Sequence, residues 1–226
     1  MIGDPPKLII KRPGQRLTEE ILAPFRERST SFVVDAMQGR GALDHGIKPL
    51  DPTSRFVGSA LTARAGARDN LAALAALEFI EPGDVLVISA QGFKETAVLG
   101  DNMARIARQR GAVAVVTDGA VRDADEIRAI GLPVFSKAVT PNSAFPSGPG
   151  EVGLPLSLGD VAVDTGDVVV GDADGVVIIS LDRLAEVTRN LEEVAAKEAA
   201  LHAKIESGGF ESLLSEAVKQ AIRYVE

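Results

Sequence analysis

An arginine and an aspartate, Arg122-Asp123, lie in the same part of the chain as a glycine-led turn, Gly100-Asp101-Asn102-Met103. The carboxylate of Asp123 can bind a hard divalent cation such as Mg²⁺ or Mn²⁺, which prefers oxygen ligands and retains several waters. The guanidinium of Arg122 can bind a carboxylate through two parallel hydrogen bonds. A cation beside an arginine suits a small α-keto acid, whose keto and carboxylate oxygens both need a partner.

The turn at 100–103 can supply the remaining groups. Its backbone N–H groups lie where an amphipathic run begins, and the first N–H groups of a helix form an anion cradle. During C–C cleavage negative charge grows on the keto oxygen, and a cation bound to that oxygen would stabilise it. Asp101 would orient a water that acts as the base.

A loop, a helix, a strand and a second loop are expected between residues 100 and 123. The amphipathic run 102–109 stops at Gly111, and the apolar run 112–116 indicates a buried strand. Such a unit brings a helix N-terminus and a strand end to the same edge of a sheet. We therefore expect one cluster of polar residues at this edge, formed by Asp101, Asp118, Arg122 and Asp123.

The rest of the chain alternates between helical and strand patterns, which indicates an α/β fold. Residues 1–16 are expected to form an extended arm. Residues 140–155 are rich in Pro, Ser and Gly and are expected to form a mobile loop. The long helix at 183–206 carries more charge than a core helix needs, so its apolar stripe is expected to lie on another surface, such as a neighbouring subunit.

Several of these residues also have a structural interpretation. An Asp-Gly turn followed by Arg-Asp is common, and Arg122 could only pair with a nearby acid. Asp172 and Asp174 could bind a cation, but their turn lacks the trailing Glu of a calcium loop, which favours a plain turn. His45 and His202 are too few and too far apart in sequence to predict a zinc site.

The composition narrows the class of protein. Of the 226 residues 46% are hydrophobic, which is enough for a sizeable core. The formal net charge of −8, with no basic patch, argues against nucleic acid as a ligand. Cysteine is absent, which excludes disulfides and thiolate chemistry. No apolar run reaches membrane-spanning length and residues 1–6 do not resemble a signal peptide, so a cytoplasmic protein is expected.

Two stretches carry a resemblance to a known family. One runs from Gly100 through Gly111–Asp123 to Leu132-Pro133-Val134-Phe135, and the other is Gly166–Val177. Both resemble the RraA-like family, and the resemblance extends over about residues 30–210. That family includes 4-hydroxy-4-methyl-2-oxoglutarate aldolases, which also decarboxylate oxaloacetate.

The resemblance implies a fold and an assembly. The fold is a swivelling β/β/α domain of the phosphohistidine-domain type, expected over residues 1–180 with an N-terminal helical arm. A C-terminal helical extension at 181–226 is expected to pack on a neighbouring subunit. The assembly is a homotrimer or a homohexamer with its active sites between subunits.

The resemblance also implies a role for each candidate residue. Arg122 is the substrate ligand, Asp123 the metal anchor and Asp101 the residue that places the catalytic water. The substrate cradle comprises Gly100, Asp101, Asn102 and Met103. A C-terminal glutamate from the neighbouring subunit completes the metal shell. Glu198 is the best match for it, and Glu193 and Glu206 remain alternatives.

The expected function is that of a metal-dependent, class II carbon–carbon lyase. It would use Mg²⁺ or Mn²⁺ to cleave a 4-hydroxy-2-oxo acid to pyruvate and a second keto acid. It would also decarboxylate oxaloacetate, because both reactions give the enolate of pyruvate. The alternative is a non-catalytic regulator that binds a ribonuclease, and a third possibility is a lyase or isomerase for another keto acid. The long C-terminal helix favours the enzyme, since the regulator branch lacks it.

Overall fold

The computed structural model describes residues 6–209, 212 and 214–225. Within these residues the chain forms a nine-stranded mixed sheet. Its centre is four parallel strands in the order β3 (Phe56–Arg64), β4 (Asp84–Ser89), β6 (Ala114–Thr117) and β8 (Val134–Ser136). Every residue of β4 and β6 is buried, as expected for parallel strands that are covered on both faces.

The long strand β3 joins this parallel centre to antiparallel edges. Its first half pairs with β13 and its second half with β10. The outer strands are β1 (Leu8–Ile10), β2 (Lys48–Pro49), β10 (Gly150–Val152), β13 (Val168–Asp172) and β14 (Gly175–Ile179).

A small parallel sheet continues the chain beyond the carboxyl ends of the central strands. It contains β5 (Ala97–Leu99), β7 (Ala120–Val121) and β9 (Ala138–Val139), which follow β4, β6 and β8 respectively. A separate hairpin comprises β11 (Leu156–Leu158) and β12 (Val161–Val163).

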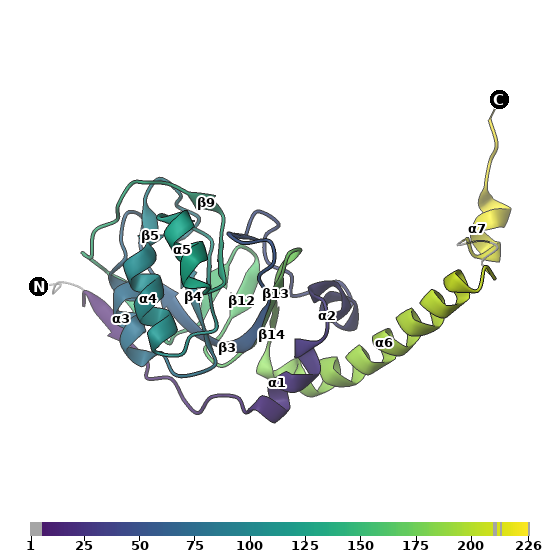
Figure 1. Cartoon of the computed structure of the whole chain (residues 1–226), viewed down its shortest axis with the longest axis horizontal. Coiled ribbons are helices and arrows are strands. Elements are labelled where there is room, and N and C mark those ends of the chain that lie inside the picture. The colour runs from purple at the N-terminus through teal and green to yellow at the C-terminus, as the bar shows by residue number, and fades with distance from the viewer. Residues whose placement is uncertain (1–5, 210–211, 213, 226) are drawn as a thin grey trace, which may run out of the picture.

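Three short helices cover one face of the central sheet (Figure 1). They are α3 (Leu71–Ala76), which continues into the 3₁₀ turn η1 (Leu77–Phe79), α4 (Asp101–Gln109) and α5 (Ala124–Ile130). Leu86 and Ile88 of β4 pack with these helices, whereas Val85 and Val87 face a second core beneath. This alternation is the period of two that a strand imposes.

A third core contains the N-terminal helices α1 (Glu19–Arg26) and α2 (Thr30–Ala36), together with β13, β14 and the start of the C-terminal helix. Asp172 caps α2: its carboxylate accepts hydrogen bonds from the backbone N–H of Thr30 at 2.8 Å and from the Thr30 hydroxyl at 2.7 Å. The acidic turn after β13 therefore has a structural role at Asp172.

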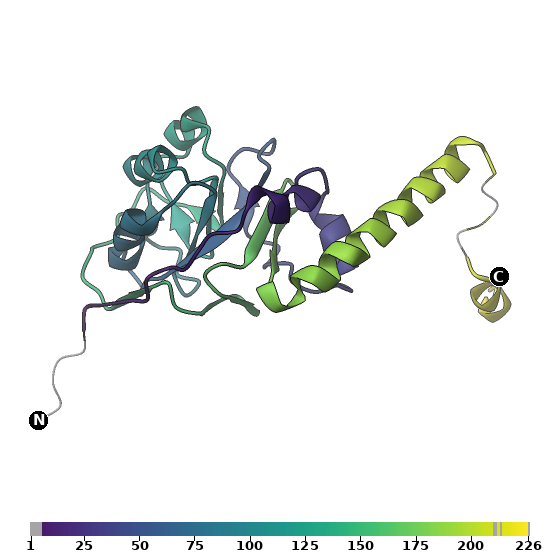
Figure 2. The same ribbon diagram turned by 90° about the horizontal axis from the view of Figure 1, so that it is seen from below.

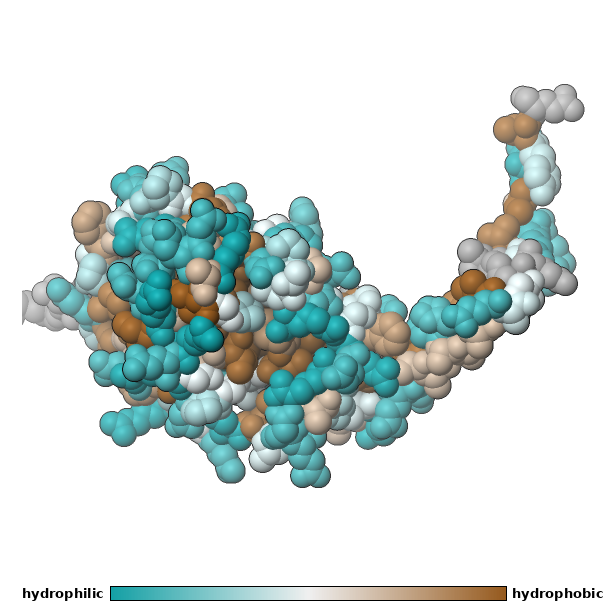
Figure 3. All heavy atoms as spheres, in the orientation of Figure 1, coloured by the Kyte–Doolittle hydropathy of each residue, from teal (hydrophilic) through white to brown (hydrophobic). Residues whose placement is uncertain are grey.

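The 3₁₀ turn η2 (Leu181–Arg183) leads into the 23-residue helix α6 (Leu184–Glu206). Only Val187 and Leu191 of α6 are buried, and the rest of the helix runs away from the body towards α7 (Glu216–Ala221) (Figures 1 and 2). Hydrophobic residues are exposed along this arm, among them Ile205, Val218 and Ile222 (Figure 3). In the described part of the chain, no helix combines the length and apolar character needed to cross a membrane.

The expected fold class is confirmed, including the long C-terminal helix. The single mobile loop expected at 140–155 is wrong, because Gly150–Val152 form β10, and Asp69 binds the backbone N–H groups of Ser147 and Gly148. The strands that pair with β10 and the carboxylate of Asp69 are both remote from this loop in sequence, so the local pattern of residues does not show them. Residues 1–5 of the expected core, and 210, 211, 213 and 226 of the expected extension, lie outside the described residues.

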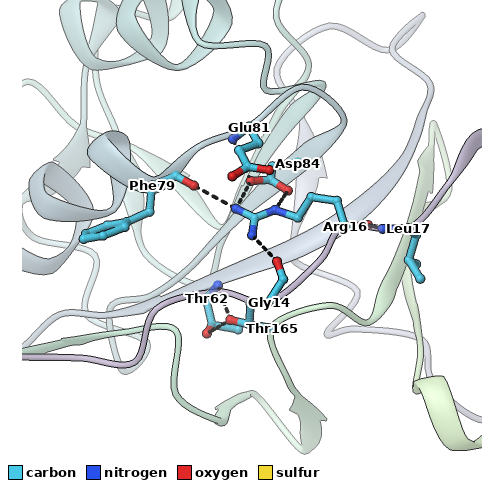
Figure 4. A network of polar contacts seen from close by, with 9 residues as sticks. Gly14, Arg16, Leu17, Thr62, Phe79, Glu81, Asp84 and Thr165 are labelled. Carbon is cyan, nitrogen blue, oxygen red and sulfur yellow. Dashed lines mark hydrogen bonds and ion pairs between the residues drawn. The ribbon is translucent and has the colours of Figure 1, made fainter.

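A buried ion pair attaches the N-terminal arm to the middle of the sheet (Figure 4). Asp84, the first residue of β4, has a fully buried side chain. Arg16 donates to its Oδ1 from Nε and to its Oδ2 from Nη2, both at 2.7 Å, and Nη2 also reaches the Phe79 carbonyl. Burial lowers the pKa of Arg16, but its hydrogen bonds and ion pair with Asp84 outweigh that effect and raise it overall.

We expect Arg16→Ala to lower the free energy of unfolding by about 3–5 kcal/mol, because it leaves a buried carboxylate without its counter-charge. Urea unfolding followed by circular dichroism measures this change. Arg26→Ala is the matched control, since Arg26 pairs with the exposed Glu19, and its unfolding midpoint should stay close to that of the parent. A loss below about 1 kcal/mol for Arg16→Ala would contradict the importance of the pair.

Candidate active site

The pairing of β5 with β7 places two parts of the candidate site side by side. Ala97 pairs with Ala120 and Leu99 with Val121, and the backbone N–H of Arg122 donates to the Leu99 carbonyl at 3.0 Å. Gly100 and Arg122, the residues that follow these strands, are therefore neighbours.

Three helix N-termini meet at this place. Asn70, Gly100 and Asp123 are the N-cap residues of α3, α4 and α5. Gly100 has no side chain, and the side chains of Asn70 and Asp123 do not cap their own helices. Between the elements lies a cavity of about 80 Å³. It is lined by Asn70, Ala97, Leu99, Gly100, Asp101, Asn102, Met103, Arg122, Ser143 and Ala144.

Asp123 does not line the cavity itself, but it contacts two residues that do, Asp101 and Arg122. Its backbone is left-handed, with φ of 58°, a conformation that side-chain-bearing residues adopt rarely and at some cost. In this conformation its Oδ2 accepts a hydrogen bond from the Asp101 N–H at 3.3 Å and lies 3.3 Å from Arg122 Nε. The carboxylate is 35% exposed and so remains accessible to a ligand.

Arg122 is held from two sides. Nε faces Asp123, and Nη1 donates a hydrogen bond to the hydroxyl of Ser143, on the loop after β9. The side chain is 40% exposed, so the guanidinium is oriented but not enclosed. A second arginine, Arg105, donates to Asp101 Oδ2 at 3.2 Å and fixes that carboxylate one helical turn away.

Fewer backbone N–H groups of residues 100–103 are free to bind an anion than the sequence predicts. The N–H of Asp101 is already directed at Asp123, and the first bond within α4 runs from the Ala104 N–H to the Gly100 carbonyl. The N–H groups of Asn102 and Met103 lie in the first turn, where a helix offers no internal acceptor. They are the donors of the turn best suited to an anionic ligand.

Asp118 does not join this cluster, so the expectation that it would is wrong. It is buried at the end of β6 and accepts hydrogen bonds from the N–H groups of Ala90 at 2.6 Å and Gly92 at 3.0 Å. Burial raises the pKa of its carboxyl, and these bonds oppose the rise. Asp118 therefore anchors the turn after β4. The bend between β6 and β7 separates it from Arg122.

A larger cavity of about 620 Å³ lies beside Asp118. Its lining includes Lys137, which pairs with Asp44 at 3.0 Å, and Arg64, which pairs with Glu151 at 2.9 Å. The smaller cavity is the better candidate, because it combines an oriented arginine, a neighbouring carboxylate and the N–H groups of a helix N-terminus.

The described residues of one chain do not form a complete metal shell. No three His, Cys, Asp or Glu side chains within them gather closely enough to hold a metal ion. Glu198 lies on α6, which leads away from the body (Figure 2). Its carboxylate is 3.6 Å from His202 Nε2 of the same helix. The donors present still fit a hard cation, because Mg²⁺ and Mn²⁺ take one or two carboxylates and several waters. Both contacts of Asp123 use Oδ2, which leaves Oδ1 for a cation.

Two polar residues of the cavity lining, Asn70 and Ser143, were not predicted from the sequence. Asn70 carries a weak signal, since an asparagine before an Ala- and Leu-rich helix normally predicts a cap. Ser143 lies in the Pro- and Ser-rich loop, where nothing in the pattern indicates its contact with Arg122.

Comparison with known proteins gives the family. A family model described as Aldolase/RraA, RraA-like, matches residues 30–178. This chain belongs to the RraA-like family.

Its relatives carry two kinds of name. A Halalkalibacterium halodurans protein, provisionally named a 4-hydroxy-4-methyl-2-oxoglutarate aldolase, is 38% identical over 71% of this chain and 76% of its own. A Thermus thermophilus protein named 4-hydroxy-4-methyl-2-oxoglutarate aldolase is 34% identical over 68% of this chain and 93% of its own. The solved structure of the RNA-processing inhibitor RraA from Thermus thermophilus has a TM-score of 0.63, at 34% identity over 68% and 93% of the two chains. The relatives' names therefore support a lyase but leave a regulatory role open.

We expect Gly100→Ala to weaken pyruvate binding by roughly tenfold or more, because displacement of binding groups by about 1 Å is enough for such losses. A Cβ at Gly100 would lie 2.6 Å from Asp123 Oδ2 and 2.9 Å from Arg122 Nε, which forces the two side chains apart. Titration calorimetry with Mg²⁺ present measures the change. Gly14→Ala, whose Cβ would meet nothing within 4 Å, is the control and should bind as the parent does. Equal affinities in all three proteins would contradict the assignment of this cavity.

Proposed function

We propose that this protein is a divalent-metal-dependent lyase that cleaves a 4-hydroxy-2-oxo acid, such as 4-hydroxy-4-methyl-2-oxoglutarate, to pyruvate and a second keto acid. One observation carries the proposal: an oriented arginine and the amides of a helix N-terminus line one small cavity, and the accessible carboxylate of Asp123 contacts residues of that lining. These groups match the carboxylate and keto oxygens of a 2-oxo acid. The aldolase names of two relatives support the same reaction.

The chain's own residues would bind and orient the substrate. Arg122, fixed by Asp123 and Ser143, binds the carboxylate next to the keto group, and the N–H groups of Asn102 and Met103 take its remaining charge. Asp123 would hold Mg²⁺ or Mn²⁺. When bound, that ion supplies Lewis-acid stabilisation of the charge that develops on the keto oxygen.

Asp101 would serve the proton transfer. Asp101 lines the cavity, and its side chain is 23% exposed and paired with Arg105, so its carboxylate can hold a water that takes the proton of the substrate's 4-hydroxyl group. Oxaloacetate needs no such proton removal, because loss of CO₂ leads directly to the enolate of pyruvate. We therefore expect the same site to decarboxylate oxaloacetate.

A second copy of the chain would complete the site. In the proposed homotrimer or homohexamer, α6 of one subunit brings Glu198 to the Asp123 of another. The projection of α6 from the body and the exposed hydrophobic residues along the arm support such a contact.

The alternative function is a regulator that binds a ribonuclease. It is favoured by the name of the Thermus thermophilus structure and by that of Streptomyces coelicolor RraAS2, described as an unusual member of the RNase ES inhibitor RraA protein family. The latter is 28% identical, with a TM-score of 0.75, over 84% of this chain and all of its own. This alternative predicts a stable complex with a ribonuclease and no release of pyruvate.

The wild-type protein should release pyruvate from 4-hydroxy-4-methyl-2-oxoglutarate and from oxaloacetate in the presence of Mg²⁺ or Mn²⁺, and a chelator should stop both reactions. A coupled lactate dehydrogenase assay measures the rate. Arg122→Ala and Asp123→Ala should each lower kcat/KM by about 100-fold or more, because each removes a charged ligand of the reacting group. Arg110→Ala and Asp125→Asn are the controls, because the side chain of Arg110 is exposed just after α4 and that of Asp125 is exposed on α5. Wild-type protein without activity on either substrate would reject the lyase.

Sites shared between subunits predict complementation. Glu198→Gln and Arg122→Ala should each be inactive alone, and mixed oligomers made by co-expression should recover part of the activity. Recovery is expected because one site in the mixture combines intact Arg122 and Asp123 with Glu198 of another subunit. Glu193→Gln and Glu206→Gln test the alternative ligands and should retain activity. Failure of mixed oligomers to recover would place the missing ligand elsewhere.

A further inference from the structure

Asn70 occupies a fixed position at the edge of the candidate cavity. It is the N-cap residue of α3, and its carbonyl accepts the Leu74 N–H at 2.9 Å. Its own N–H donates to the Phe145 carbonyl at 3.3 Å, which ties it to the loop that carries Ser143. The backbone therefore holds the Asn70 side chain beside the cavity.

The usual structural role of such an asparagine belongs to its neighbour. An N-cap asparagine normally accepts a hydrogen bond from the first turn of its helix. The Asn70 side chain makes no such bond, and Asp69 accepts the Leu71 N–H at 2.8 Å instead. Asp69 also binds Ser147 and Gly148 through its second oxygen, so it fixes both the helix start and the loop.

The side-chain oxygen of Asn70 is buried and has no hydrogen-bond partner among the described residues. A buried oxygen without a donor is costly, so one in a native structure calls for a specific explanation. Asp101 lines the same cavity from the first turn of α4. Asn70 and Asp101, two residues with acceptor side chains, thus line the same small cavity, and a buried water is stabilised where it finds several polar partners.

We propose that Asn70 is a positioning residue for the water that acts as the base, and that it holds this water jointly with Asp101. The inference rests on the proposed lyase function. The water donates one hydrogen to Asp101 and the other to Asn70 Oδ1, so that its lone pair faces the substrate. Rotation about the last torsion of the asparagine side chain, which is broad, would turn Oδ1 towards the cavity.

In the cleavage of the 4-hydroxy-2-oxo acid, one proton leaves the 4-hydroxyl group and one electron pair moves to the pyruvate half. The water accepts the proton of the 4-hydroxyl group, and a proton passes on to Asp101. The C3–C4 bond breaks, the hydroxyl oxygen becomes the keto oxygen of the second acid, and the electron pair of the bond stays with the pyruvate half as its enolate. Protonation of C3 then gives pyruvate. Decarboxylation of oxaloacetate breaks its C–C bond without removing a hydroxyl proton, so it does not need this water.

The test compares the two reactions in the full-length protein. Asn70→Leu should lower kcat for 4-hydroxy-4-methyl-2-oxoglutarate by about 10- to 100-fold, with KM within about twofold. This loss is smaller than the roughly 10²–10⁴-fold contribution of a positioned base, because the variant still has Asp101 to hold the water. Its kcat for oxaloacetate should change by less than about threefold, and its melting temperature should match the parent, since the side chain caps nothing. Asn70→Asp keeps an oxygen in the same place and should restore the ratio of the two kcat values towards that of the parent.

Asn142→Ala is the matched control. Asn142 lies next to Ser143, and its amide donates to the Glu95 carbonyl at 3.0 Å outside the cavity lining. It should leave the ratio of the two reactions unchanged. If Asn70→Leu lost both reactions equally, or lost activity together with a lowered melting temperature, the positioning role of Asn70 would be rejected. The proposed lyase function would not be affected by either result. A wild-type protein inactive on both substrates would instead reject the lyase itself, and this inference with it.

Discussion

The buried carboxylate of Asp84 is the constraint on which the rest of the fold depends. It stands at the start of β4, in the middle of the parallel sheet, where an unpaired charge would be strongly destabilising. Arg16 neutralises it, so the N-terminal arm must cross the sheet before α1 begins. Asp84 pairs in register with Ser59 of β3, and its carbonyl accepts the Val113 N–H before β6. The registers of the three central strands are thereby fixed from one end, and the loops at their other ends acquire defined positions.

Those loops form the candidate site because three of the central strands, β4, β6 and β8, are each followed by a short strand of a second sheet. The pairing of β5 with β7 brings Gly100 beside Arg122, and no Cβ fits between Gly100 and Asp123. Asn70 and Asp123 are both residue types that normally cap helices, and neither does so here. Side chains that depart from a local preference in this way are expected where binding or catalysis sets the requirement.

The long C-terminal helix has a different physical character from the rest of the molecule. Its first turns are packed against the N-terminal helices, and the remainder exposes hydrophobic side chains on an arm that leaves the body. One chain also lacks, within its described residues, a group of three side chains able to hold a metal ion. Both features are explained together if the arm of one subunit completes the site of another, as we propose.

The sequence by itself determined the α/β class, most helices and buried strands, and the grouping of Gly100, Asp101, Arg122 and Asp123 in one place, because these follow from local periodicity, turn residues and a family motif. It did not determine the edge strands β1 and β10, the separation of Asp118 from Arg122, or the presence of Asn70 and Ser143 at the cavity. Each of these depends on which distant segments pair: β1 with β10, Ala90 with Asp118, and Ser143 with Arg122. A local pattern reports the preference of a residue, whereas the register of the sheets decides which residues share a cavity.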